Sequence, residues 1–336
     1  MAEEIITLTM NAAVDSCLEA DELRESGKTY CRPCGDLPGG GGVNVARAVR
    51  LLGGEALAVV LLGGPTGRLL AELLDREGVT HYDIPLDGDV RRTSIVFVPG
   101  DHRRFQLVLP GSEVAAAEWL ACLHTVEELA RDAAYLVLSG SLPPGVPDDF
   151  YARVAHHARR AGCRVAVEAP PTALAAALDE GVYLAKPDRH GFDRLVGVAT
   201  HDAAGRLEAA RRYVREGAAD IFVATFGAEG SIVAAADESF AVPPPPIQLR
   251  SEVGAGASYL GAFILGLSQG RPLRDCAAFA SGAAGSALET WGPGLCEPRA
   301  TERLAALVRT AMDDAGARPA GTEARSGGDA GTSHAR

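Results

Sequence analysis

Short apolar runs and helix-length amphipathic stretches alternate along most of this chain, with glycine or polar turn residues between them. The apolar runs predict strands at Ile5–Met10, Leu57–Leu62, Tyr135–Ser139, Arg164–Glu168, Val182–Ala185, Ile221–Thr225 and Ser231–Ala235. The amphipathic stretches predict helices at Val43–Leu52, Gly67–Glu77, Ala115–Leu129, Asp148–Arg160, Arg206–Glu216, Ser258–Gln269, Leu273–Glu289 and Thr301–Ala315. Such alternation is typical of βαβ units, so the sequence predicts an α/β fold with a mostly parallel central sheet and helices on both faces.

Two segments break this alternation, Cys17–Leu37 and Arg91–Val108, which contain short extended runs and few helix signals. They are expected to pair into a small accessory β-sheet that projects from the main sheet as a lid. Residues 317–336 are rich in Gly, Ala, Ser, Arg and Thr and have almost nothing to bury, so this tail is expected to be disordered. The sequence therefore predicts one domain over residues 1–316, including the lid, followed by a disordered tail.

Composition and charge limit the classes of function that are open to the chain. The formal net charge of −12 argues against nucleic-acid binding, because phosphate backbones are held by clustered Lys and Arg. The first residues are acidic and no stretch of about 18 apolar residues occurs, so neither a signal peptide nor a membrane span is expected. The seven cysteines are interpreted as reduced thiols of a cytoplasmic protein. No metal site is expected, because the single Cys-x-x-Cys, Cys31 to Cys34, lacks a second pair or a suitably spaced His.

A run of four glycines, Gly39 to Gly42, stands immediately before the predicted helix that begins at Val43. Glycines at such a place let the backbone approach a ligand closely and direct amide groups at it. Asn44, in the first turn, can both donate to and accept from a hydroxyl group. A flexible loop is the alternative reading, but the run does not fit the dinucleotide-binding fingerprint. The segment is interpreted as part of a ligand site.

A second glycine-rich segment, Val253-Gly254-Ala255-Gly256-Ala257-Ser258, leads into another predicted helix. Small residues here leave successive amides exposed at the helix N-terminus, and such amides favour negative charge. Gly254, Ala255 and Gly256 therefore predict an anion hole for a transferring phosphoryl group, with a plain tight turn as the alternative.

These two segments and five others resemble the ribokinase/PfkB carbohydrate kinase family over nearly all of residues 5–310. The other matching segments are Thr7–Asn11 followed by Asp15, Ser139–Gly145, Lys186-Pro187, Phe226–Gly230 and Pro243–Pro246. Within the family, the run from Pro38 to Arg47 looks most like the minor bacterial ATP-dependent 6-phosphofructokinases. The resemblance implies a ribokinase-like three-layer α/β/α sandwich with a small β lid. It also implies ATP-dependent phosphoryl transfer to a hexose phosphate, similar to fructose 6-phosphate, or to a related polyol.

The resemblance also implies roles for individual residues. Sugar hydroxyls would be held by Asp15, Gly40, Gly41 and Asn44, and the substrate's own phosphate by Arg91 and Ser139. The ATP side, with Mg²⁺, would be lined by Lys28, Lys186, Asp188, Thr225, Gly227 and Gly230. Lys28 and Arg91 are alternatively solvated surface charges, and Asp15 is alternatively a turn or cap residue.

The chain departs from the family at three points. The family has an aspartate immediately after Gly-Ala-Gly that takes the proton from the attacking hydroxyl, whereas here that position is Ala257, whose methyl group cannot accept a proton. Where the family usually has Asn-x-x-Glu after Lys-Pro, this chain has Asp188-Arg189-His190-Gly191, and Asp188 is a candidate magnesium ligand. Ser251-Glu252 stands where Asp-Thr is common. The sequence leaves open whether Glu252, Asp188 or Asp15 supplies a substitute carboxylate.

Three hypotheses follow from the retained segments and the missing groups. The first is an ATP-dependent kinase with impaired or altered chemistry, and it is the preferred one. The second is a non-catalytic pseudokinase that binds sugar phosphate, nucleotide or both in a regulatory role. The third is an enzyme of a different reaction class that uses the same pocket. In each case the expected partners are small molecules and a second copy of the chain, since relatives cover the apolar face of the lid by pairing two lids into a homodimer.

Overall fold

The predicted strands lie in one nine-stranded sheet, together with two strands that the sequence analysis did not predict. The computed structural model describes residues 4–101, 103–197, 202–250, 253–290 and 294–317. The strands are β1 (Ile5–Thr9), β4 (Leu57–Leu62), β5 (His81–Pro85), β8 (Tyr135–Ser139), β9 (Arg164–Glu168), β10 (Val182–Ala185), β11 (Ala219–Thr225), β12 (Ser231–Ala235) and β13 (Ser239–Val242). Their order is β13-β12-β11-β10-β9-β8-β1-β4-β5, and all neighbours are parallel except those of β12. The mostly parallel sheet is confirmed.

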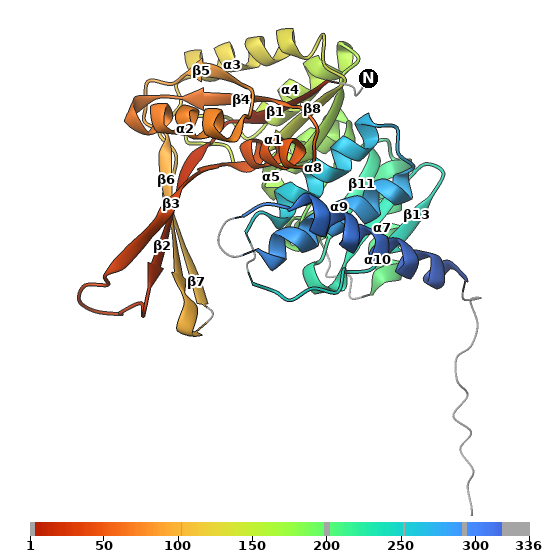
Figure 1. Ribbon diagram of the computed structural model, residues 1–336. Helices are drawn as coiled ribbons and strands as arrows, with labels where there is room; N and C mark the ends of the chain where they lie inside the picture. Colours follow the sequence, from red (N-terminus) through yellow and green to blue (C-terminus); the bar gives the residue numbers. More distant parts are fainter. Residues whose placement is uncertain (1–3, 102, 198–201, 251–252, 291–293, 318–336) are drawn as a thin grey trace, which may run out of the picture.

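Helices cover both faces of this sheet, because side chains along each strand alternate between the two faces. Ile5 and Val137 pack with the helices of one face, whereas Ile6 and Leu136 pack with those of the other. The first face is covered by α1 (Gly41–Leu51), α2 (Gly64–Glu77), α8 (Ala255–Ser268), α9 (Leu273–Glu289) and α10 (Pro298–Ala317). The second is covered by α3 (Ala116–Leu129), α4 (Phe150–Arg160), α5 (Pro171–Glu180), α6 (Arg189–Val196) and α7 (Ala203–Arg215). This three-layer arrangement is the one that the resemblance implied (Figure 1).

The two segments that break the alternation form a separate four-stranded sheet. Its strands are β2 (Ala13–Ala20), β3 (Cys31–Gly39), β6 (Arg91–Val98) and β7 (Arg103–Val108), in the order β3-β2-β6-β7. The sheet projects away from the main body in Figure 1. The expected accessory sheet is therefore confirmed, although it begins at Ala13 rather than Cys17, because β2 pairs with β6 from Arg91 onward.

Several elements lie outside the predicted set. The helices α5 and α6 fall in segments for which no helix was predicted: α5 is a short alanine-rich stretch after two prolines, and α6 has only eight residues. At the C-terminus, α10 continues to Ala317, and the rest of the expected disordered tail lies outside the described residues. Among the helices that the structure describes, none combines the length and the apolar character needed to span a membrane.

Candidate active site

The carboxyl ends of the parallel strands meet along one edge of the main sheet, where open α/β sheets bind ligands. Ser139 ends β8, Glu168 ends β9 and Lys186 follows β10 at this edge. A pocket of about 520 Å³ opens there. It is lined by Gly41, Asn44, Ser139, Gly140, Ser141, Glu168, Ala169, Pro170, Pro171, Lys186, Asp188, His190, Gly254, Gly256 and Ala257. Residues separated by more than 200 positions in the sequence therefore share one cavity.

The glycine run at the start of α1 packs directly against the ends of β1 and β8. A Cβ atom on Gly41 would lie 2.5 Å from the backbone carbon of Ser139, and one on Gly42 would lie 2.5 Å from the Leu8 carbonyl oxygen. The Val43 amide donates to Thr9 Oγ1 at 2.7 Å. Side chains at these glycines would separate the loop from the strands, so glycine is needed to hold the N-terminus of α1 at the pocket.

Two charged residues predicted to contact the sugar phosphate lie at the base of the small sheet. Asp15, on β2, is 8% exposed, and burial raises the pKa of its carboxyl group against the opposing effects of a Thr93 hydrogen bond and the Arg47 and Arg91 charges. Arg91 begins β6 and donates to the carbonyl oxygens of Leu109 and Asn11, both at 3.2 Å. A Cβ atom on Gly39 would lie 2.5 Å from Asp15 Oδ2, so this carboxyl group adjoins the glycine run.

Lys186 and Glu168 form a buried ion pair in the pocket. The Lys186 side chain is 1% exposed and its Nζ atom pairs with Glu168 Oε1, while Ser139 Oγ donates to Glu168 Oε2 at 3.2 Å. A Cβ atom on Gly256 would lie 3.2 Å from Glu168 Oε1 and 3.7 Å from Lys186 Nζ. The carboxylate and the ammonium group therefore both face the second glycine-rich turn.

This turn starts α8. Gly254 is the N-cap, with a φ of 80°, and its carbonyl oxygen accepts from the Ser258 amide at 2.8 Å. Amides of the first helical turn have no partner within the helix, so they are available to an anion. The methyl group of Ala257 belongs to the pocket wall at the same turn. The predicted anion-hole residues and the position of the missing base thus lie beside Glu168 and Lys186.

A second, smaller cavity of about 140 Å³ lies on the other side of the turn. It is lined by Thr225, Gly227, Gly230, Ser231, Pro244, Pro245, Ala255, Gly256, Tyr259, Ser281, Ala284, Gly285 and Leu288. Gly256 lines both cavities. The small residues and prolines leave a narrow, largely apolar space, which suits a flat aromatic group.

The segment Asp188 to Gly191 starts α6 at the pocket. Asp188 is the N-cap, and its Oδ1 atom accepts from the Gly191 amide at 2.7 Å. Arg189 joins this segment to the loop after β11, because it donates to the Phe226 carbonyl oxygen at 2.8 Å and pairs with Glu229. In the part of the chain that the structure describes, no group of three His, Cys, Asp or Glu side chains converges as a metal site. Asp188 is therefore one of two carboxylates among the described residues that line the pocket, and one of its oxygens already accepts a hydrogen bond from the start of α6.

The structure brings most of the predicted site residues together, but Asp15, Gly40 and Arg91 are not among the lining residues of either cavity. Lys28 lies exposed in the loop between β2 and β3 and lines neither cavity. Ser251 and Glu252 lie outside the described residues. The pocket residues that had not been predicted as site residues include Glu168, His190 and Tyr259. Glu168 carried a usable signal, because it is a charged residue at the carboxyl end of a buried parallel strand.

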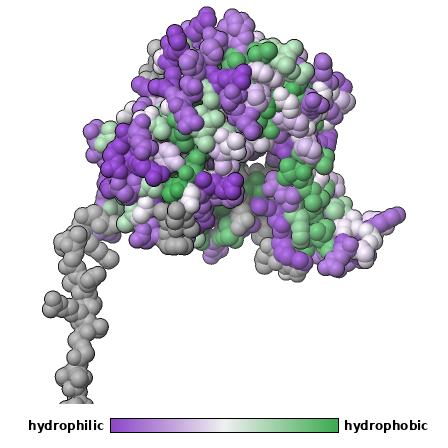
Figure 2. Space-filling view, turned by 180° about the vertical axis from the view of Figure 1, so that it is seen from behind, coloured by the Kyte–Doolittle hydropathy of each residue, from purple (hydrophilic) through white to green (hydrophobic). Residues whose placement is uncertain are grey.

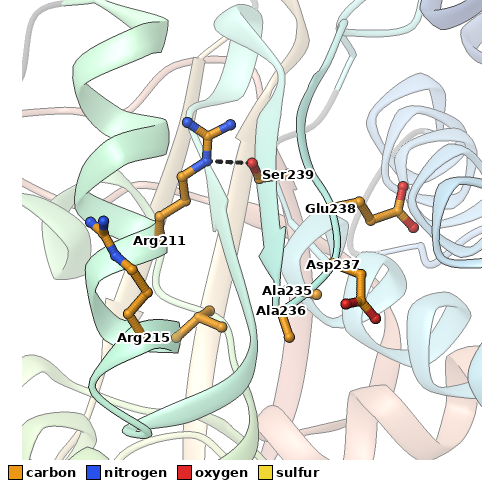
Figure 3. A pocket seen from close by; sticks show the side chains of 8 residues that line it. Arg211, Arg215, Ala235, Ala236, Asp237, Glu238 and Ser239 are labelled. Atoms are coloured by element: carbon orange, nitrogen blue, oxygen red, sulfur yellow. Dashed lines mark hydrogen bonds between the residues drawn. The ribbon is translucent and has the colours of Figure 1, made fainter.

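A further surface hollow, of about 630 Å³, lies at the opposite edge of the sheet (Figure 3). It is formed by α7 and the turn between β12 and β13, where Arg211 donates to Ser239. Arg211 and Arg215 also pair with Glu208. The hollow contains none of the predicted site residues, since β12 runs antiparallel to β11 and carries this turn away from the carboxyl edge.

Comparisons with known proteins agree with this geometry. The family model described as pfkB family carbohydrate kinase matches residues 8–300. The chain is 35% identical over 304 residues to the ATP-dependent 6-phosphofructokinase isozyme 2 of Mycobacterium tuberculosis, covering 90% of this chain and 89% of that protein. The crystal structure of phosphofructokinase-2 from Escherichia coli in complex with fructose-6-phosphate is similar with a TM-score of 0.86 at 32% identity, covering 91% of this chain and 99% of that one. The tetrameric inhibited form of the same protein gives the same TM-score, identity and coverage.

Proposed function

This chain belongs to the pfkB family of carbohydrate kinases, and from that premise we propose that it transfers the γ-phosphoryl group of ATP to a hexose phosphate similar to fructose 6-phosphate. The observation that carries the proposal is the pair of cavities that meet at the turn of Gly254 and Gly256. Phosphoryl transfer depends mainly on positioning and on stabilising the charge of the transferred group, and a glycine turn between two ligand cavities suits both tasks.

The larger cavity is the proposed sugar-phosphate side. Its floor is formed by Gly41 and Asn44, with Ser139 at the end of β8, and Asp15 and Gly40 adjoin it through the glycine run. Arg91 is the proposed phosphate ligand from the base of the lid, because a guanidinium group binds phosphate through two parallel hydrogen bonds. The Nε atom of Arg91 is buried and has no hydrogen-bond partner among the described residues, so the guanidinium group retains an unused donor.

The smaller cavity is the proposed nucleotide side. Thr225, Gly227 and Gly230 form one wall, and Lys186 lies beside the turn where the phosphates of ATP would pass between the cavities. The residues present fit the phosphates of the nucleotide, because Gly256 leaves free the space that a side chain would take. A Cβ atom there would lie 3.2 Å from Glu168 Oε1. Mg²⁺ would neutralise phosphate charge, and Asp188 is the pocket carboxylate that we propose would contact it.

The proposed activity is tested by measuring ADP release with ATP·Mg and fructose 6-phosphate. We expect turnover that requires both substrates and is well above the rate without protein. Matched assays with fructose and with glucose 6-phosphate test the two parts of the substrate separately. If none of the three sugars stimulates ADP release, the proposal is wrong.

A second candidate is a non-catalytic protein that binds the same ligands. The observation in its favour is Ala257, because loss of a general base typically lowers a rate by about 10²–10⁴-fold. Calorimetric binding of fructose 6-phosphate and of ATP·Mg without turnover would favour this candidate over the first.

We further propose that the protein is cytoplasmic and acts as a homodimer in which two lids pair. Apolar side chains gather over the projecting sheet in Figure 2, and Leu107, Val108 and Leu109 are each more than half exposed. The strands β3 and β7 stand at the two ends of this sheet, so each has one edge that no strand of the described residues pairs with.

A further inference from the structure

The pocket contains a carboxylate, Glu168, that was not among the substitute bases suggested by the sequence. Among its described lining residues, Glu168 and Asp188 are the two carboxylic acids. Asp188 is engaged at the start of α6, where its Oδ1 atom caps the helix by accepting from Gly191. Glu168 caps no helix; it stands in the last residue pair between β8 and β9, opposite Ser139, and it lines the cavity.

Glu168 is also held in one orientation. Its Oε2 atom accepts from Ser139 Oγ at 3.2 Å, and its Oε1 atom pairs with the buried Lys186. Only 24% of the side chain is exposed. A carboxylate held at both oxygens loses little conformational freedom when a substrate binds. Such a carboxylate is suited to accept a proton, because it is already in position.

The Oε1 atom faces the turn where the phosphoryl group would be transferred. The position that a Cβ atom would take on Gly256 is 3.2 Å from Oε1, and the next residue, Ala257, lines the same wall. The missing carboxylate of the family would belong to residue 257. Glu168, at the end of β9, therefore lines the same part of the pocket as Ala257 on α8.

Lys186 does not prevent this role. Its ammonium group lies 3.7 Å from the same Gly256 Cβ position, so a phosphoryl group in the turn would lie beside it as well. An ammonium group shared with phosphate oxygens binds the carboxylate less tightly. The loose transition state of phosphoryl transfer also requires only a weak base.

We propose that Glu168 replaces the missing aspartate as the general base, an inference that rests on the proposed kinase function. The sugar hydroxyl loses its proton to Glu168 Oε1 while its oxygen forms a bond to the γ-phosphorus atom. The bond between that phosphorus atom and the β–γ bridging oxygen breaks, and the electron pair leaves with ADP. Glu168 is then neutral and returns its proton to solvent when the products depart.

The test is a cycle of three variants, Glu168→Gln, Ala257→Asp and the double variant, assayed with ATP·Mg and fructose 6-phosphate. Glu168→Gln is expected to lower kcat by about 10²–10⁴-fold with little change in KM. Ala257→Asp alone is expected to change kcat less than about tenfold, because a base is already present, whereas in the Glu168→Gln background it restores most of the lost rate. Calorimetric binding of both substrates is expected to be unchanged in Glu168→Gln. Glu127→Gln is the matched control, since this partly buried glutamate of α3 pairs with His157 on α4 and does not line the pocket.

The outcomes separate this inference from the proposed function. An unchanged rate in Glu168→Gln, or a loss that Ala257→Asp does not restore, overturns the role of Glu168 while native turnover upholds the kinase. A silent native protein that gains about 10²-fold or more activity from Ala257→Asp overturns both the base and the native activity. Silence of all four proteins also overturns both. If Glu168→Gln does not fold, Ala257→Asp alone decides, because a large gain in rate means that the native protein has no working base.

Discussion

Arg47, in the second turn of α1, ties the glycine run to the rest of the fold. Its guanidinium group donates to both carboxylate oxygens of Glu77 at 2.6 and 2.7 Å, and to the Pro38 carbonyl oxygen at 2.8 Å. Because Arg47 is 6% exposed, Glu77→Ala would leave a buried charge without its partner. We expect a loss of about 3 kcal/mol in unfolding free energy, measured by urea denaturation, and a raised KM for fructose 6-phosphate.

Glu72→Ala is the matched control for this prediction. Glu72 lies on the same helix, α2, and pairs with Arg76 at 3.4 Å, but both side chains are more than 60% exposed. Exposed pairs of this spacing contribute about 0.5 kcal/mol or less. A similar loss of stability in the two variants would show that burial of Arg47 is not what makes the first pair important.

Gly41 is the position where a single methyl group would disturb the sugar side most directly. Its Cβ atom would lie 2.5 Å from the Ser139 backbone, which cannot move without displacing β8. Gly41→Ala is expected to cost about 1–3 kcal/mol of stability and to weaken fructose 6-phosphate binding in calorimetry. At Gly100, in the turn between β6 and β7, an added Cβ would meet nothing within 4 Å, so Gly100→Ala should leave both quantities unchanged.

At the scale of elements, α6 and α7 begin with the same cap but lie in different places. Asp188 and Asp202 each accept from an amide three residues later at 2.7 Å, and only Asp188 lines the pocket. Replacing either by Ala should cost about 1 kcal/mol, whereas Asn preserves the cap. We therefore expect Asp188→Asn to retain the melting temperature but to bind ATP·Mg more weakly by calorimetry. Asp202→Asn should change neither, and equal ATP·Mg affinity in both Asn variants would remove Asp188 from the nucleotide side.

The contact between β5 and α2 gives the fold a pH-dependent component. His81 interacts with Asp83 and Asp75, and although burial lowers its pKa, these two carboxylates outweigh that effect and raise it above 6.5. The protonated histidine is therefore favoured in the folded state, so its stabilising effect is complete below pH 6.5 and is lost as the pH rises through the folded pKa. The melting temperature of the native protein should exceed that of His81→Gln most at low pH. A difference that grows with pH would contradict this assignment.

Elements with a strong local signal were predicted closely, whereas contacts between elements were not. The strands Leu57–Leu62 and Tyr135–Ser139 match the structure to the residue, because each is an apolar run that ends abruptly in a turn. The glycine segments also predicted residues that line the larger cavity, since few other residues permit such close backbone contact. The pairing of Glu168 with Lys186 depends on β9 and β10 being neighbours and on both side chains turning toward α8. That information arises only from the assembled sheet.

At the scale of the whole molecule, the projecting sheet has an apolar surface that one copy does not cover. Leu107, on β7, is 57% exposed, while Ile95 on the adjacent β6 is fully buried, so the outer strand lacks the cover that its neighbour has. Pairing of two lids would bury this surface and the open strand edge. We expect the native protein to sediment as a dimer and Leu107→Lys to shift it toward monomer, whereas Leu307→Lys, at an exposed leucine of α10, should not. A native monomer, or equal dissociation by both substitutions, would contradict assembly through the lid.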